Sequence, residues 1–124
     1  MVLKPNMILN GKESGIKNNK DEVADFTLKC IQNNLPTETP GVAFLSGGQS
    51  EFEATENLNQ INKQNKSSFA FTYSFGRALQ QSALKTWAKD LKNIEAVQKV
   101  FDERSEMNSL AAKGEWSADL ENAA

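Results

Sequence analysis

Two short apolar runs that each lead into a serine and a glycine constrain this chain more than any other feature. "GVAFL" (41–45) precedes "SGGQS", and "FAFTYS" (69–74) precedes "FGR". A continuous apolar run of this length, next to turn residues, is typical of a strand buried on both faces. A helical pattern follows each run, so the sequence predicts consecutive strand–loop–helix units in a parallel sheet.

The segment before these runs adds one more unit of the same kind. Residues 1–4 are predicted to end a strand, and residues 5–18, rich in Asn, Gly and Lys, to form a loop. A helix is expected from Asn19, which has capping-box spacing to Glu22, up to Pro36. Its apolar positions recur at helical spacing. They are Val23, Phe26, Cys30 and Ile31.

Three more helices are predicted after the glycine-rich loops. Ser50 and Glu53 form an S-x-x-E capping box, and residues 62–68 read as the return loop of that helix. The next helix follows "FGR", and a last one spans roughly 92–112. The apolar positions expected on the inner sides of these helices are Ala54, Leu58, Ile61, Leu79, Leu84, Trp87, Ile94, Val97, Val100, Phe101 and Leu110. Residues 117–124 carry no periodicity and are expected to fray.

Composition and charge exclude several classes of function. The net charge of −2 provides no general attraction to nucleic acid or anionic membranes. No apolar run approaches the roughly 18 residues that span a bilayer, and Lys4 and Pro5 interrupt any signal core, so a cytoplasmic protein is expected. The chain has no histidine, which excludes most zinc sites and Ser-His-Asp triads. The single Cys30 cannot form an intrachain disulfide and is expected in the core.

The two glycine loops predict a phosphate site. In a parallel sheet both loops lie at the same edge, and each is followed by the positive end of a helix. Glycine allows backbone N–H groups to approach an anion, and Arg77 adds a permanent charge. Taken singly, Gly47-Gly48 is more often a turn and Arg77 more often a surface residue; their combination favours the phosphate site. The candidate residues are Ser46, Gly47, Gly48, Ser74, Gly76 and Arg77.

Lys4 is the candidate catalyst. Most lysines are solvated side chains, but Lys4 lies at the carboxyl end of a predicted strand. A lysine that is partly desolvated and close to other cations there has a lowered pKa, and its neutral amine can attack a ketone to form a Schiff base.

These residues resemble the class I fructose-bisphosphate aldolases. "VLKPNM" is similar to the sixth-strand segment of that family, "PGVAFLSGGQSEFEATENLNQINK" to the seventh strand and its helix, and "FTYSFGRALQQSALKTWA" to the eighth. "MNSLAAKGEW" resembles the family's C-terminal segment. The resemblance implies that residues 1–116 are the last three βα units and C-terminal helices of a (β/α)₈ TIM barrel, which requires eight strands to close.

The resemblance also implies a reaction. Lys4 would be the Schiff-base lysine for reversible cleavage of fructose 1,6-bisphosphate to dihydroxyacetone phosphate and glyceraldehyde 3-phosphate, a step of glycolysis and gluconeogenesis. The two glycine loops would hold the phosphate on the first carbon. No metal and no other cofactor is expected, since the iminium replaces a Lewis acid.

Departures from the family pattern set further expectations. The family's first five strands have no counterpart in this sequence, and they carry the family's proton-transferring acids, a second lysine and the other phosphate site. In addition, Phe75 stands where a tyrosine is usual. The isolated chain is therefore expected to be inactive or very weak, and either to self-associate or to pair with a complementary N-terminal barrel part. The alternatives are a catalytically dead, truncated phosphate-binding remnant and a purely structural or interaction role.

Overall fold

The computed structural model describes residues 1–123. The element order confirms the predicted alternation of strands and helices from the first helix onward, whereas the strand predicted at residues 1–4 is reduced to an isolated bridge at Leu3. A 3₁₀ turn lies within the first loop, and five α-helices and two strands follow. The elements are η1 (Lys12–Ser14), α1 (Lys20–Asn34), β1 (Val42–Phe44), α2 (Glu51–Gln64), β2 (Phe71–Tyr73), α3 (Arg77–Lys89), α4 (Ile94–Lys113) and α5 (Ala118–Ala123).

The strands form a small parallel sheet. β1 and β2 pair in parallel, with Val42 opposite Phe71. On the other side of β1, Leu3 forms a parallel bridge with Val42, and the Ala43 amide donates to the Leu3 carbonyl at 2.8 Å. The N-terminal segment therefore lies at one edge of the sheet, β1 at the centre and β2 at the opposite edge.

Helices cover one face of this sheet. Val42, Phe44 and Phe71 are buried, and the rings of Phe44 and Phe71 stack with centroids 5.7 Å apart. Side chains alternate between the faces of a strand, and between these buried residues Ala43 is only half-buried and Thr72 is exposed. The second face of the sheet is therefore uncovered among residues 1–123.

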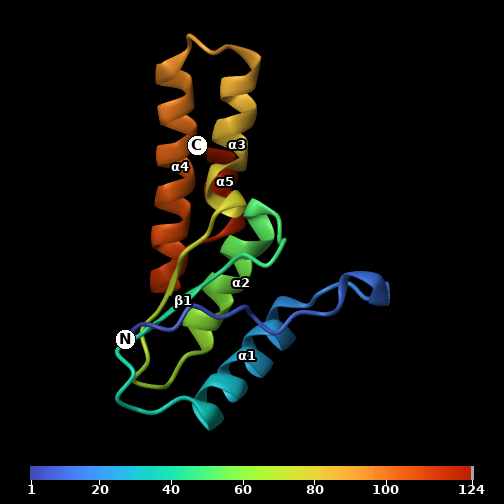
Figure 1. The fold of residues 1–124 in the computed structure, drawn as a ribbon, viewed down its shortest axis with the longest axis vertical. Helices are drawn as coiled ribbons and strands as arrows, with labels where there is room; N and C mark the ends of the chain where they lie inside the picture. The colour runs from blue at the N-terminus through green and yellow to red at the C-terminus, as the bar shows by residue number, and fades with distance from the viewer. Residues whose placement is uncertain (124) are drawn as a thin grey trace.

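The helices meet mainly around α2, which packs against α1, α3 and α4. Figure 1 shows α3 and α4 running side by side as a long hairpin that projects away from the strands. The core that these elements enclose is largely aliphatic and aromatic. Its members include Met7, Val23, Leu28, Ile31, Leu58, Ile61, Phe69, Met107 and Trp116.

Several predicted core positions are wrong. Leu84, Trp87 and Ile94 are exposed, because they lie on the projecting part of the α3–α4 hairpin, where no other element covers them. The buried positions of α4 lie further along the helix, beside α2. They are Arg104, Met107, Asn108 and Ala111.

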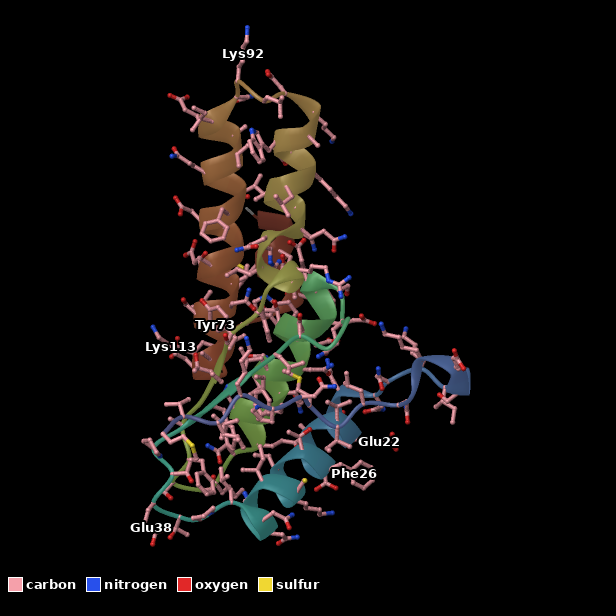
Figure 2. The ribbon with its side chains drawn as sticks, in the orientation of Figure 1. Glu22, Phe26, Glu38, Tyr73, Lys92 and Lys113 are labelled. Carbon is pink, nitrogen blue, oxygen red and sulfur yellow. The ribbon has the colours of Figure 1, made fainter. Side chains whose placement is uncertain are left out.

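Two predicted core residues of helix α1 are also exposed. Cys30 and Phe26 are exposed, and Figure 2 shows Phe26 pointing away from the rest of the molecule. The expectation that both lie in the core is wrong, since the helix buries a narrower face. That face is formed by Val23, Ala24, Thr27, Leu28 and Ile31.

The C-terminal end also differs from the expectation of a frayed segment. Gly114 ends α4 with a left-handed φ of 73°, and Trp116 is then 3% exposed. The Trp116 amide donates to Asn59 Oδ1 at 3.0 Å, and α5 follows at once. Two tertiary contacts hold this segment: the burial of Trp116 and the hydrogen bond from its amide to Asn59. The sequence shows no helical periodicity there because no amphipathic face is needed.

No helix within residues 1–123 combines the length and apolarity that crossing a membrane requires.

Candidate functional site

The predicted site residues follow the three parallel segments at their carboxyl ends. The N-terminal segment leads into the loop of residues 5–18, β1 leads into Ser46–Gln49, and β2 leads into Ser74–Arg77. Because β1 is central, its glycine loop lies between the other two loops. All candidate residues therefore lie on the side of the sheet where the strands have their carboxyl ends.

The loop after β1 is a tight glycine turn. The Gln49 amide donates to the Ser46 carbonyl at 3.0 Å, and Gly47 and Gly48 have φ values of 58° and 82°. A Cβ on Gly47 would collide with the side-chain amide of Asn6 from the neighbouring loop. The positive φ therefore favours glycine at position 47, and any Cβ there would also displace the Asn6 side chain.

Gln49 fixes this turn to α2. Its side-chain amide donates to the Ser46 carbonyl at 3.0 Å and its Oε1 accepts from Asn57 Nδ2 at 2.7 Å. Ser50 and Glu53 form the predicted capping box in full, with hydrogen bonds of 3.0 and 3.2 Å. These bonds hold the glycine turn rigidly against the start of α2.

The loop after β2 leads into a helix without a side-chain cap, whereas the loop after β1 leads into the capped start of α2. Gly76 is the N-cap residue and makes no side-chain capping bond. Within residues 1–123 the backbone amides of Arg77 and Ala78 find no acceptor, and the Arg77 guanidinium has no carboxylate within 4.0 Å. This helix start can accept an anion through free amides and a free cation.

Lys4 lies on the uncovered face of the sheet. The Leu45 amide donates to the Pro5 carbonyl at 3.0 Å, which continues the parallel ladder and places Leu3 and Pro5 in register with β1. Alternation then directs Lys4 to the same face as Ala43. Its side chain is exposed. An amine there is accessible to a ketone, but residues 1–123 provide no cover that would desolvate it.

A cleft of about 570 Å³ opens beside the glycine turn. Of the predicted site residues it includes only Gly47 and Gly48; Lys4, Ser46, Ser74, Gly76 and Arg77 lie outside its lining. Residues that the sequence reading missed complete it, among them Asn6, Asn10, Lys12 and Lys17. Polar residues of an Asn- and Lys-rich loop carry no local signal that separates them from solvated side chains.

Comparison with known proteins gives one family. The model of class I fructose-bisphosphate aldolase matches residues 1–124. A fructose-bisphosphate aldolase of Dictyostelium discoideum is 42% identical over 118 residues, which are 95% of this chain and 33% of that protein. A cytosolic fructose-bisphosphate aldolase of Arabidopsis thaliana is 45% identical over 97% of this chain and 31% of its own length.

A solved structure agrees with the sequence comparison. Fructose-bisphosphate aldolase from Plasmodium falciparum, crystallised with TRAP and a small-molecule inhibitor, superposes with a TM-score of 0.89 at 43% identity. The superposition covers 94% of this chain and 34% of that one. The chain thus spans about a third of the length of the relatives it matches. On this evidence the chain belongs to the class I fructose-bisphosphate aldolase family.

Proposed function

We propose that this chain supplies the Schiff-base lysine and one phosphate grip of a class I fructose-bisphosphate aldolase. The observation that carries the proposal is the register of the sheet. It brings Lys4, the Gly47-Gly48 turn and the start of α3 to the carboxyl ends of three adjacent parallel segments. In a (β/α)₈ barrel, catalytic residues and phosphate loops occupy this edge.

Lys4 is the nucleophile in this proposal. Its neutral amine attacks the ketone carbon, water leaves, and a protonated iminium joins the lysine to the sugar. The electron pair of the C3–C4 bond then moves into the iminium, and glyceraldehyde 3-phosphate departs. The base that accepts the C4 hydroxyl proton would come from the family's first five strands. A proton added at C3 then converts the enamine back to an iminium, and water hydrolyses it to release dihydroxyacetone phosphate and restore Lys4. The reverse sequence joins the two three-carbon phosphates.

The grip on the first phosphate involves both glycine loops. The amides at the start of α3 and the Arg77 guanidinium, which have no acceptor and no carboxylate partner within residues 1–123, favour a dianion. Gly47 and Gly48 allow backbone approach from the neighbouring turn. Ser46 and Ser74 add hydroxyls next to these loops. Fixing the phosphate holds the ketone against Lys4, which is a positioning contribution to catalysis.

The proposed partner is a complementary barrel part. The N-terminal segment and β2 each leave a sheet edge unpaired within residues 1–123, and the Lys4 face of the sheet is uncovered. Strand edges of this kind are templates for further pairing. Five more βα units would pair both edges, cover Lys4 and close a (β/α)₈ barrel. Self-association is the alternative way to satisfy the same edges. We place this assembly in the cytoplasm, where glycolysis occurs.

A second candidate function rests on the exposure of Lys4. Hydrogen bonds of Gln49 tie the glycine turn to α2, and no carboxylate of residues 1–123 pairs with Arg77, yet the Lys4 side chain is exposed. A chain with these features alone could bind a sugar phosphate without turning it over, and would then be a non-catalytic phosphate-binding or interaction remnant. This candidate predicts phosphate binding without any covalent adduct.

The experiment that separates the two is chemical trapping. The 124-residue chain is mixed with dihydroxyacetone phosphate and reduced with borohydride, and the intact mass and modified peptide are measured. An adduct on Lys4 that is absent from Lys4→Arg supports the aldolase role. Lys92→Arg is the matched control and should still give the Lys4 adduct. A folded wild-type chain that yields no Lys4 adduct, alone or with an N-terminal aldolase fragment, would contradict it.

A further inference from the structure

A lysine outside the predicted site lies directly on the glycine turn. A Cβ built on Gly48 would lie 2.5 Å from Lys12 Nζ and 3.0 Å from its Cε. The ammonium group therefore occupies the space that a side chain at position 48 would need. Because both residues line the 570 Å³ cleft, the Lys12 charge faces the same opening as the glycine turn.

The loop that carries Lys12 is closed at its base. The Asn10 amide donates to Asn18 Oδ1 at 2.7 Å, and Asn10 Nδ2 donates to the Lys17 carbonyl at 3.4 Å. Between these residues the η1 turn is tied by Ser14 Oγ, which donates to the Gly11 carbonyl at 2.7 Å. The ammonium is thus presented by a closed loop and not by an open linker.

The charge of Lys12 is uncompensated. No carboxylate of residues 1–123 lies within 4.0 Å of its Nζ. Glu53 is the acidic residue in the lining, and its carboxylate accepts from the Ser50 amide at 3.0 Å as part of the capping box. Lys17 adds a second positive charge to the same lining. The cleft therefore favours an anion over a cation.

We propose that Lys12 is a positioning residue for a phosphate monoester held on the Gly47-Gly48 turn. The strand order places the Lys12 loop on one side of this turn and Arg77 on the other. The ammonium contacts the anion from within the cleft, whose lining includes Lys12, Gly47 and Gly48 but not Arg77. This inference rests on the proposed function, since it adds a second cation to the phosphate grip assigned there.

The test is a titration of the ¹⁵N-labelled chain with inorganic phosphate at low ionic strength, followed through the amide signals of Gly47 and Gly48. We expect Lys12→Ala to raise the dissociation constant by about three- to tenfold, which is the range for losing one charge-assisted contact at a partly solvated site. Lys12→Arg should keep it within about twofold. Lys92→Ala makes the same charge change at the far tip of the α3–α4 hairpin (Figure 2) and should leave it unchanged.

Arg77→Ala distinguishes this inference from the proposed function. If Arg77→Ala weakens phosphate binding while Lys12→Ala leaves it unchanged, the role of Lys12 is overturned and the phosphate grip stands. Equal losses for Lys12→Ala and Lys92→Ala would indicate a general charge effect and would also overturn it. If phosphate fails to shift Gly47 and Gly48 in the wild-type chain, both the grip and the role of Lys12 are overturned.

Discussion

Arg104 of α4 and Glu121 of α5 form a nearly buried ion pair. One guanidinium nitrogen of Arg104 donates to both carboxylate oxygens of Glu121, at 2.8 and 2.6 Å, and the two side chains are only 10% and 20% exposed. The Trp116 indole donates to the same carboxylate at 3.1 Å. A single acid therefore joins the last helix, the preceding tryptophan and the longest helix of the fold.

Removing this acid should destabilise the chain measurably. Glu121→Ala would leave the Arg104 charge without its carboxylate, and we expect a loss of about 1–3 kcal/mol in the free energy of unfolding. Urea unfolding followed by the emission of the buried Trp116, in a Trp87→Phe background, measures it. Asp25→Ala is the matched control. It breaks the exposed Lys29–Asp25 pair, which should contribute less than about 0.5 kcal/mol. Equal effects of the two changes would contradict the prediction.

The glycine turn gives a second prediction. Gly47→Ala should destabilise the chain by about 1–2 kcal/mol, because φ of 58° is unfavourable for alanine, and the collision with Asn6 adds to this cost. Phosphate binding should fall with it, because the turn must move. Gly11→Ala is the control, since that glycine has φ of −59° and no atom within 4 Å of a built Cβ. Denaturant midpoints and phosphate titration of both variants check the prediction. A Gly47→Ala chain as stable as Gly11→Ala would show that the turn adapts.

The start of α2 gives a third prediction. Ser50→Ala removes the capping-box acceptor for the Glu53 amide, and we expect a loss of about 1 kcal/mol. Because this helix anchors the glycine turn, phosphate affinity should weaken as well. Ser68→Ala provides the comparison, because Ser68 is exposed in a return loop. Thermal unfolding by circular dichroism measures the stability of the two variants, and phosphate titration measures their affinity. An unchanged midpoint for Ser50→Ala would mean that the capping box is not stabilising.

The sequence predicted those features of the structure whose signals are local. The Ser50–Glu53 capping box and the two strands were confirmed because their signals lie within a few residues. Helical periodicity predicted the helices, but it does not indicate which part of each helix packs against other elements. It therefore placed Leu84, Trp87 and Ile94 inside, although they lie on the projecting hairpin.

The tertiary anchors had no local signal at all. Arg104 is charged and yet buried, because Glu121 and Thr55 from two other helices meet it. Lys12 lies in an irregular loop, and its approach to Gly48 depends on how two strands pair. The order of strands explains why Lys4, Gly47 and Arg77 were nevertheless predicted at one edge. That prediction needed only the parallel topology.

Cys30 gives the last prediction, because it reports on the free edge of the sheet. It is exposed on α1 and lines an apolar groove of about 270 Å³ with Leu3, Ile8 and Leu35. In the chain alone, a bulky thiol reagent should modify Cys30 at nearly the rate measured in denaturant. If a complementary N-terminal barrel part pairs with the edge at Leu3, its strand and helix would cover this groove. Adding such a fragment should then slow the modification at least tenfold.

The control places the thiol elsewhere on the same protein. Cys30→Ser combined with Lys92→Cys moves it to the hairpin tip, far from the sheet (Figure 2), where the fragment should not alter the rate. Protection of both thiols would indicate nonspecific aggregation instead of pairing. An unprotected Cys30 in a mixture that nevertheless gains aldolase activity would place the contact on another surface. Protection of Cys30 alone would assign the pairing to the N-terminal edge, next to the segment that carries Lys4.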